Sequence, residues 1–136
     1  MDLRFEAVTL AVSDVDRAKA FYERAGFHLD VDFAPSDTFR VVQFTPPGSP
    51  ASVVFGVGVG TASPGPVRGM YLVVTDLEAA CRELAGRGIE VEAPRHMTSE
   101  GWADGVDPAH ADYNSFSGFD DPDGNGWLLQ ERGHTG

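Results

Sequence analysis

The stretches AVTLAVSDVDRAKAFYERAGFHL (Ala7–Leu29) and GMYLVVTDLEAACRELAGRGIEV (Gly69–Val91) align with each other without a gap. Each copy begins with an extended apolar run and continues with apolar residues at helical spacing. Each then reaches a glycine, Gly26 or Gly88, of the kind that suits a helix C-terminus. The alignment indicates an internal duplication, in which each copy predicts a strand followed by an amphipathic helix.

The helix starts and the following strands can also be predicted. The capping boxes Ser13-x-x-Asp16 and Thr75-x-x-Glu78 predict where the two helices begin. Three strands are expected after each helix, so that each half is a βαβββ unit. The expected strands span about residues 27–33, 39–45 and 51–58 in the first half, and 89–92, 113–119 and 126–131 in the second.

These elements predict an α+β fold in which duplicated βαβββ modules form a curved mixed sheet around a cavity. Neither half buries both faces of its sheet alone, so we expect the halves to join around a shared concave space. The chain is expected to be a single domain, residues 1–136. Module one is about 5–58, the glycine- and proline-rich linker is 59–68, and module two is about 69–131.

The stretch DPDGNGWLLQE (Asp121–Glu131) looks like the opening of a calcium-binding EF-hand loop. The twelfth position of that loop needs a bidentate glutamate, and here it is Arg132. Asn-Gly and Asp-Gly between two extended runs instead favour a β-hairpin that joins residues 115–120 to residues 126–131.

Composition restricts the partners of the chain. Its 136 residues have a formal net charge of −11, and no basic patch is visible. This acidity argues against nucleic acid and against anionic membranes as partners, and it mildly favours neutral or cationic ligands.

The single cysteine, Cys81, excludes a disulfide framework within one chain. No signal peptide and no apolar run of membrane-spanning length are found, so a cytoplasmic location is expected.

The duplicated βαβββ pattern, the run VSDVDRAKAFYERAGF (residues 12–27) and the DPDGN hairpin resemble the vicinal oxygen chelate superfamily. This group includes glyoxalase I, extradiol dioxygenases and bleomycin-binding proteins. The resemblance implies a homodimer. In metal-using relatives it also implies one divalent ion, held by a His early in the first strand and a Glu in the last strand of each half.

Carried over by position, the ligand sites of the metal-using relatives fall on Ala7, Gly69 and Leu128. The fourth ligand would come from the last strand of the first half, and residues 46–67 contain no Asp, Glu, His or Cys. Ala, Gly and Leu side chains cannot coordinate a cation. We therefore expect no metal and no other cofactor at this site.

Strand alternation predicts the residues that line the cavity. Thr9, Tyr71, Leu128 and Gln130 are expected to contact a ligand, whereas the facing of Arg40 and Gln43 stays open. The irregular stretch 93–112 is interpreted as a lid. It adds Trp102, and Tyr113 follows it as a further ligand contact. Within the stretch, His110 is the candidate general acid or base, because imidazole exchanges protons near neutral pH.

A relocated metal site built from His96, His110 and Asp112 is an alternative without supporting spacing. His134 lies in a tail that is expected to be disordered.

Three functions stay open. The first is a metal-independent protein that binds a drug or metabolite, for which a hydrophobic or aromatic ligand is expected. The second is a metal-independent lyase, isomerase or cyclase that uses His110, Tyr71 or Tyr113 for proton transfer. The third is a metal-dependent glyoxalase or dioxygenase, which the missing ligands disfavour.

Overall fold

The computed structural model describes residues 1–60 and 65–135. Two compact units are present, and each is described by itself. Unit 1 comprises Met1–Val67 and Asp121–Asn125, and unit 2 comprises Arg68–Asp120 and Gly126–Gly136. Residues 61–64 of the expected linker lie outside the described residues. The expected joining of the two halves around one cavity stays a prediction.

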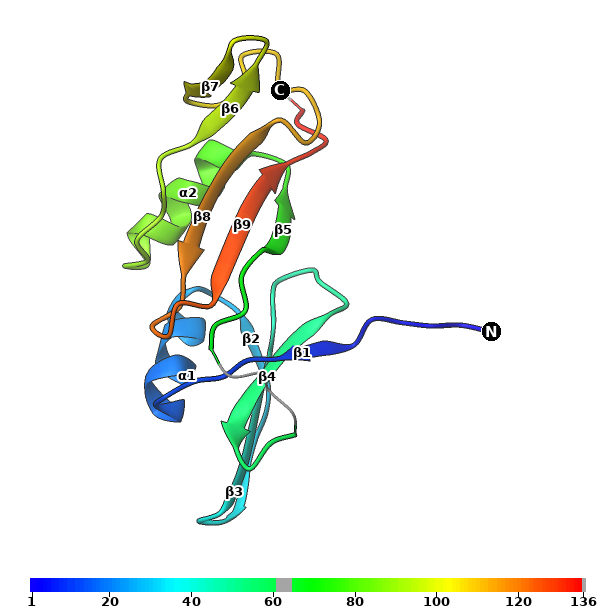
Figure 1. Cartoon of the computed structure of the whole chain (residues 1–136), viewed down its shortest axis with the longest axis vertical. Coiled ribbons are helices and arrows are strands. Elements are labelled where there is room, and N and C mark those ends of the chain that lie inside the picture. Colours follow the sequence, from blue (N-terminus) through cyan, green and yellow to red (C-terminus); the bar gives the residue numbers. More distant parts are fainter. Residues whose placement is uncertain (61–64, 136) are drawn as a thin grey trace. The chain divides into compact units, whose positions relative to one another are not determined.

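Unit 1 contains a four-stranded sheet with the strand order β1-β4-β3-β2, and one helix (Figure 1). Strand β1 runs parallel to β4, and the other neighbours are antiparallel. The elements are β1 (Ala7–Thr9), α1 (Val15–Arg24), β2 (His28–Ser36), β3 (Phe39–Thr45) and β4 (Ser52–Val57). The sequence prediction of one strand, one helix and three strands is confirmed for this half.

An aromatic cluster forms the core of unit 1. The ring of Tyr22 on α1 lies 5.8 Å, between centroids, from both Phe44 on β3 and Phe55 on β4. All three residues are fully buried, as are Val42 and Ala18. Burying aromatic rings of this size stabilises a unit by several kcal/mol, roughly 1.5–3 kcal/mol for each side chain. One face of the sheet is therefore covered by α1.

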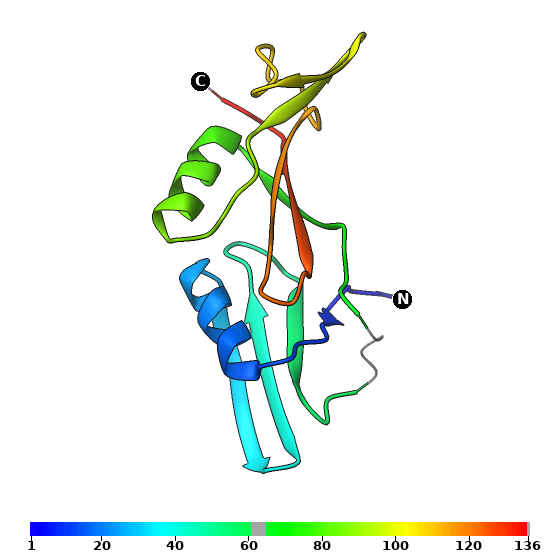
Figure 2. The same ribbon diagram turned by 60° about the vertical axis from the view of Figure 1, so that its left-hand side comes forward.

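Unit 2 contains a five-stranded sheet with the order β5-β9-β8-β6-β7 and one helix, which lies against one side of the sheet (Figure 2). Strands β5 and β9 are parallel, and the other pairs are antiparallel. The elements are β5 (Met70–Val74), α2 (Leu77–Gly86), β6 (Arg95–Thr98), β7 (Gly101–Asp104), β8 (Ser115–Asp120) and β9 (Gly126–Glu131).

Two expectations for this half are wrong. Residues 89–92 form no strand, and the stretch 93–112 contains the hairpin β6–β7 instead of being irregular throughout. The amide of Ile89 closes the end of α2 by donating to the carbonyl of Leu84, and Pro94 has no N–H to donate. A continuous strand can therefore start only at Arg95.

The helix caps lie one residue later than the capping boxes predict. The N-cap residues are Asp14 and Asp76, whose carboxylates accept hydrogen bonds from the amides of Arg17 and Ala79. A carboxylate at the N-cap satisfies a free amide and also interacts favourably with the helix dipole. At the other ends, Gly26 and Gly88 adopt φ values of 88° and 83°, as their role as helix terminators predicts.

The DPDGN turn is stabilised by hydrogen bonds that other groups of the chain donate to its side chains. The buried carboxylate of Asp121 accepts from the amides of Asp123 and Asn125 and from the hydroxyl of Tyr22, which lies 2.8 Å away. The side chain of Asn125 accepts from the amide of Val67. The predicted hairpin between residues 115–120 and 126–131 is confirmed by the β8–β9 ladder.

Helices α1 and α2 each have ten residues. Within residues 1–60 and 65–135, neither helix is long and apolar enough to cross a membrane.

Candidate functional site

The side of the unit 2 sheet that faces away from α2 is rich in exposed apolar side chains. Tyr71 and Val73 on β5 are 61% and 56% exposed, whereas Trp127 and Leu129 on β9 are buried on the opposite side. The register pairs Tyr71 with Leu128. Alternation along β5 and β9 therefore follows the sequence prediction, with Tyr71 and Leu128 on one face.

The strand register shows that this face continues across all five strands. Gln130 pairs with Phe116, which pairs with Arg95, and Met97 on the same strand as Arg95 pairs with Trp102. Residues directly opposite each other on neighbouring strands share a face. We call this surface the aromatic face; its residues are Tyr71, Val73, Arg95, Met97, Trp102, Phe116, Leu128 and Gln130.

Trp102 is the largest side chain of the aromatic face, and it is 56% exposed. Its ring meets Phe116 edge-on at 5.5 Å between centroids. The guanidinium carbon of Arg95 lies 5.3 Å from the centre of the same ring, which is a cation–π distance. The indole is thus held from two sides and still offers surface to a ligand.

The structure brings four of the predicted site residues together. Tyr71, Trp102, Leu128 and Gln130 all lie on the aromatic face. Trp102 lies on β7, a strand that the local periodicity of the sequence did not predict. Sequence reasoning missed Phe116 and Met97 on the same face, although the alternation of Phe116 with Ser115 and Ser117 could have indicated the first.

Tyr113 and His110 both have positive φ values, 63° and 50°. The ring of Tyr113 is half exposed and lies 5.6 Å from the guanidinium carbon of Arg132. His110 is hydrogen-bonded to Glu131, which neighbours Gln130 on β9 and therefore lies on the opposite, α2 side of the sheet. His110 is not part of the aromatic face.

Unit 1 also has a sheet face that α1 does not cover. Thr9 pairs with Val54, Val54 pairs with Gln43, and Gln43 pairs with Val31. Phe33, two residues further along β2, is 56% exposed. Thr9 therefore lies on this second surface, together with apolar side chains that the sequence did not single out. The bulge at Asp30 interrupts the alternation of β2 and hides that signal.

The structure also settles the facing of Arg40 and Gln43. Arg40 lies on the α1 side, where it pairs with Asp16 and Asp32. Gln43 lies on the open face, where its amide nitrogen donates to Asp30 at 3.3 Å. Thr45 also donates its hydroxyl to the Asp30 carboxylate, so this face combines one carboxylate with hydroxyl, amide and apolar groups.

The side chains at the positions carried over from the metal-using relatives do not fit a metal. The register supplies the fourth position that the sequence left open. Thr9 pairs with Val54 as Tyr71 pairs with Leu128 in the second copy, so Val54 corresponds to Leu128. Ala7, Val54, Gly69 and Leu128 have no nitrogen, oxygen or sulfur in their side chains, and none can ligate a divalent ion.

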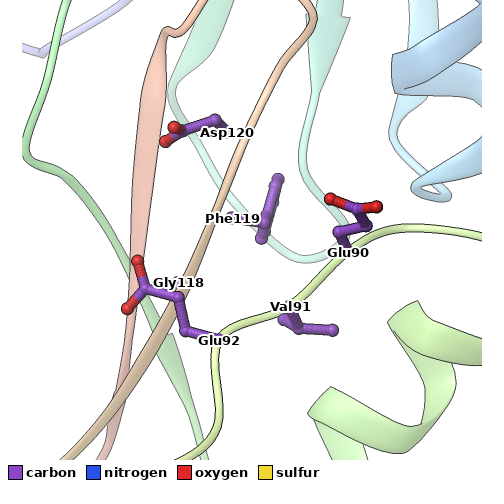
Figure 3. A pocket seen from close by; sticks show the side chains of 6 residues that line it. All are labelled: Glu90, Val91, Glu92, Gly118, Phe119 and Asp120. Atoms are coloured by element: carbon purple, nitrogen blue, oxygen red, sulfur yellow. The ribbon is translucent and has the colours of Figure 1, made fainter.

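A pocket of about 300 Å³ lies in unit 2 where β8 faces the segment before β6 (Figure 3). It is lined by Glu90, Val91, Glu92, Gly118, Phe119 and Asp120. Glu92 pairs with Arg95 at 2.9 Å, and Asp120 lies 3.9 Å from Arg68. The pocket is therefore acidic, with part of its charge already compensated by the protein.

The alternative metal site of His96, His110 and Asp112 is not assembled. The Nδ1 atom of His96 lies 2.7 Å from the carbonyl oxygen of Gly105. The carboxylate of Asp112 accepts from the amide of Gly133. His110 has different partners, Glu131 and His134.

The fold and the site define a duplicated α+β protein with open, partly apolar sheet faces. The chain belongs to the Glyoxalase/Bleomycin resistance protein/Dioxygenase superfamily, which its residues 4–129 match. The resemblance to the vicinal oxygen chelate proteins is thereby confirmed. No curated protein sequence matches the chain.

Solved structures support the same assignment. TnmS3, an antibiotic binding protein from Streptomyces sp. CB03234, is 31% identical, with a TM-score of 0.71 and 96% of each chain covered. A glyoxalase/bleomycin resistance protein from the same source is 32% identical, with a TM-score of 0.68, covering 94% of this chain and 100% of that chain. A superfamily member from Sphaerobacter thermophilus DSM 20745 is 27% identical, with a TM-score of 0.70, covering 96% and 98%.

Proposed function

We propose that this protein binds a hydrophobic or aromatic small molecule, of the drug or metabolite class, on the aromatic face. The exposure of Tyr71, Val73 and Trp102 on one sheet face carries this proposal. Contiguous exposed apolar surface is uncommon on soluble proteins and marks interaction sites. Arg95 and Gln130 supply polar groups that would orient the ligand.

The proposed binding needs no metal. Ala7, Val54, Gly69 and Leu128 leave the superfamily's metal position without ligands, so a substrate could not be polarised there by a cation. The similarity to TnmS3, which is described as an antibiotic binding protein, supports binding as the function. An antibiotic with a planar ring system is the ligand class that a partly exposed indole suits best.

We also propose that the protein works as a homodimer. Unit 1 has a sheet face with exposed apolar residues, among them Val31 and Phe33, that lies outside the proposed ligand site. Closed twofold dimers are the commonest protein assembly, and they bury such surface.

Trp102→Ala tests the site. The chain has two tryptophans, and Trp127 is buried. Quenching of the Trp102 fluorescence would therefore report a ligand on the aromatic face, and calorimetry would give its affinity. A panel of aromatic antibiotics is titrated first. For a ligand that binds, Trp102→Ala is expected to weaken binding by about 1–3 kcal/mol, the usual cost of removing an aromatic contact.

Leu3→Ala is the matched control, because Leu3 is an exposed apolar residue outside both sheets. Its affinity should equal that of the unaltered protein. A second titration in the presence of a chelator should also give unchanged affinity. If Trp102→Ala and Tyr71→Ala both bind as well as the unaltered protein, the ligand lies elsewhere. Binding abolished by the chelator would contradict metal independence.

A further inference from the structure

On the α2 side of the unit 2 sheet, we propose a divalent transition-metal site formed by His110, Glu131 and His134. This site is separate from the aromatic face and from the superfamily's metal position. It does not depend on the proposed ligand-binding function. The ions that suit its mixed imidazole and carboxylate donors are Zn²⁺, Co²⁺ and Ni²⁺.

The three side chains converge. One donor atom from each can be chosen so that all lie within 4.8 Å of one another. The Nδ1 atom of His110 is 2.7 Å from Oε1 of Glu131, and the Nδ1 atom of His134 is 3.8 Å from Oε2. Two donors on one tetrahedral Zn²⁺, each about 2.1 Å from it, are about 3.4 Å apart. Shifts of about an ångström, together with a rotation of one imidazole out of the parallel stack, therefore bring the cluster to metal-binding geometry, with the ion replacing the proton between His110 and Glu131.

The buried carboxylate is the centre of the site. Glu131 is 1% exposed, and its Oε2 also accepts the amide of Leu77 at the start of α2. A buried charge is costly unless it is paired. The two imidazoles lie on one side of it, with their rings stacked 3.7 Å apart between centroids. They remain 29% and 18% exposed, so an ion can reach the site from solvent.

The loop before β8 is organised to present His110. The amide of His110 donates to the carbonyl of Asp107. The carboxylate of Asp107 accepts from Asn114 and from the amides of Ala109 and Ala111, and these hydrogen bonds hold its pKa below the ordinary value. The positive φ of His110 is an uncommon conformation for a side-chain-bearing residue, and here it directs the imidazole toward Glu131.

His134 reaches the cluster from beyond β9. Its Nδ1 atom lies 3.1 Å from the carbonyl oxygen of Thr75, so the residue is packed, contrary to the expectation of a disordered tail. A bound ion would tie this segment and the 107–114 loop to the start of α2. With three protein ligands, a fourth position would stay open to water or another donor.

The test uses the untagged chain, because a histidine tag would bind the same ions. After chelator treatment and dialysis, Zn²⁺ is titrated by calorimetry, and Co²⁺ is titrated while visible absorption is recorded. We expect one ion per chain and absorption bands typical of a four-coordinate Co²⁺ centre. His110→Ala and His134→Ala should each weaken the affinity about tenfold or more.

His28→Ala is the control, because His28 is an exposed imidazole in unit 1. It should bind Zn²⁺ as the unaltered chain does. His134→Ala is the decisive variant, since His134 lies outside every strand and helix and its loss leaves the core intact; circular dichroism checks this. The proposal is overturned if no saturable uptake of one ion per chain occurs, or if His134→Ala binds with unchanged affinity.

Discussion

At the scale of single residues, Asp32 shows how a charge on the surface of unit 1 is coupled to folding. Its carboxylate accepts hydrogen bonds from Arg40 and from Lys19 at 2.8 Å. The Arg40 guanidinium, followed by the Lys19 ammonium, lowers the pKa of Asp32 from 3.8 to about 2. The hydrogen bond to Asp32 in turn raises the pKa of Lys19.

The depressed pKa of Asp32 predicts a dependence of stability on pH. The stabilisation is complete above the unfolded value of 3.8 and is lost as pH falls through the folded value of about 2. Asp32→Asn should therefore lower the free energy of unfolding at pH 7 by about 1 kcal/mol or less, because the site is partly screened by solvent. The difference should shrink toward pH 2.

Urea unfolding at pH 7 and at pH 2 measures this difference. Asp37→Asn is the control, since Asp37 is an exposed carboxylate in the turn between β2 and β3. An equal effect of Asp32→Asn at both pH values would show that the ion pairs do not act through ionisation.

At the scale of elements, both helices begin at an aspartate N-cap. Asp14 and Asp76 accept the amides of Arg17 and Ala79, both at 3.0 Å. Asp14→Ala and Asp76→Ala are each expected to lower the free energy of unfolding by about 1 kcal/mol, the usual value of an N-cap. Denaturant unfolding followed by circular dichroism measures the change.

Thr75→Ala separates the two possible cap positions, because Thr75 would be the cap if the capping box were formed. It should change stability by only a few tenths of a kcal/mol, the range found for surface substitutions. A larger loss for Thr75→Ala than for Asp76→Ala would contradict the observed cap. Ser13 is unsuitable for this comparison, because its hydroxyl donates to Asp123 at 2.7 Å.

The β6–β7 hairpin is the element that differs most between expectation and structure. Its register pairs Met97 with Trp102. Strand β6 lies beside β8 as β2 lies beside β3 in unit 1, so β7 is the strand that is added at the edge of the unit 2 sheet. In the described residues, the unit 1 sheet ends at β2 and has no counterpart of β7. The stretch interpreted as a lid therefore contains a strand that extends the sheet and supplies Trp102 to the aromatic face, and its role as a lid stays a prediction.

At the scale of the whole molecule, the proposed homodimer is directly measurable. Sedimentation velocity at micromolar concentration should give a species of twice the chain mass of 14.6 kDa. The physical reason is the burial of exposed apolar sheet residues, which is favourable by about 25 cal/mol per Å². A single species of 14.6 kDa across this concentration range would exclude the dimer.

The sequence by itself determined the duplication, the ends of both helices at Gly26 and Gly88, and the DPDGN hairpin. These features are local, because periodicity, glycine conformation and side-chain chemistry can be evaluated within one short segment. Alternation along β5 and β9 also predicted that Tyr71 and Leu128 share a face, since both strands are regular.

Only the tertiary structure decided which distant residues meet. Pairing of β6 with β8 and of β6 with β7 brought Trp102 and Phe116 together, and the loop before β8 brought His110 to Glu131 and His134. The register between strands far apart in sequence depends on packing of the whole sheet, and a shift by one residue would move every side chain to the other face. No local pattern contains that information, so the aromatic face and the histidine cluster emerge only from the folded chain.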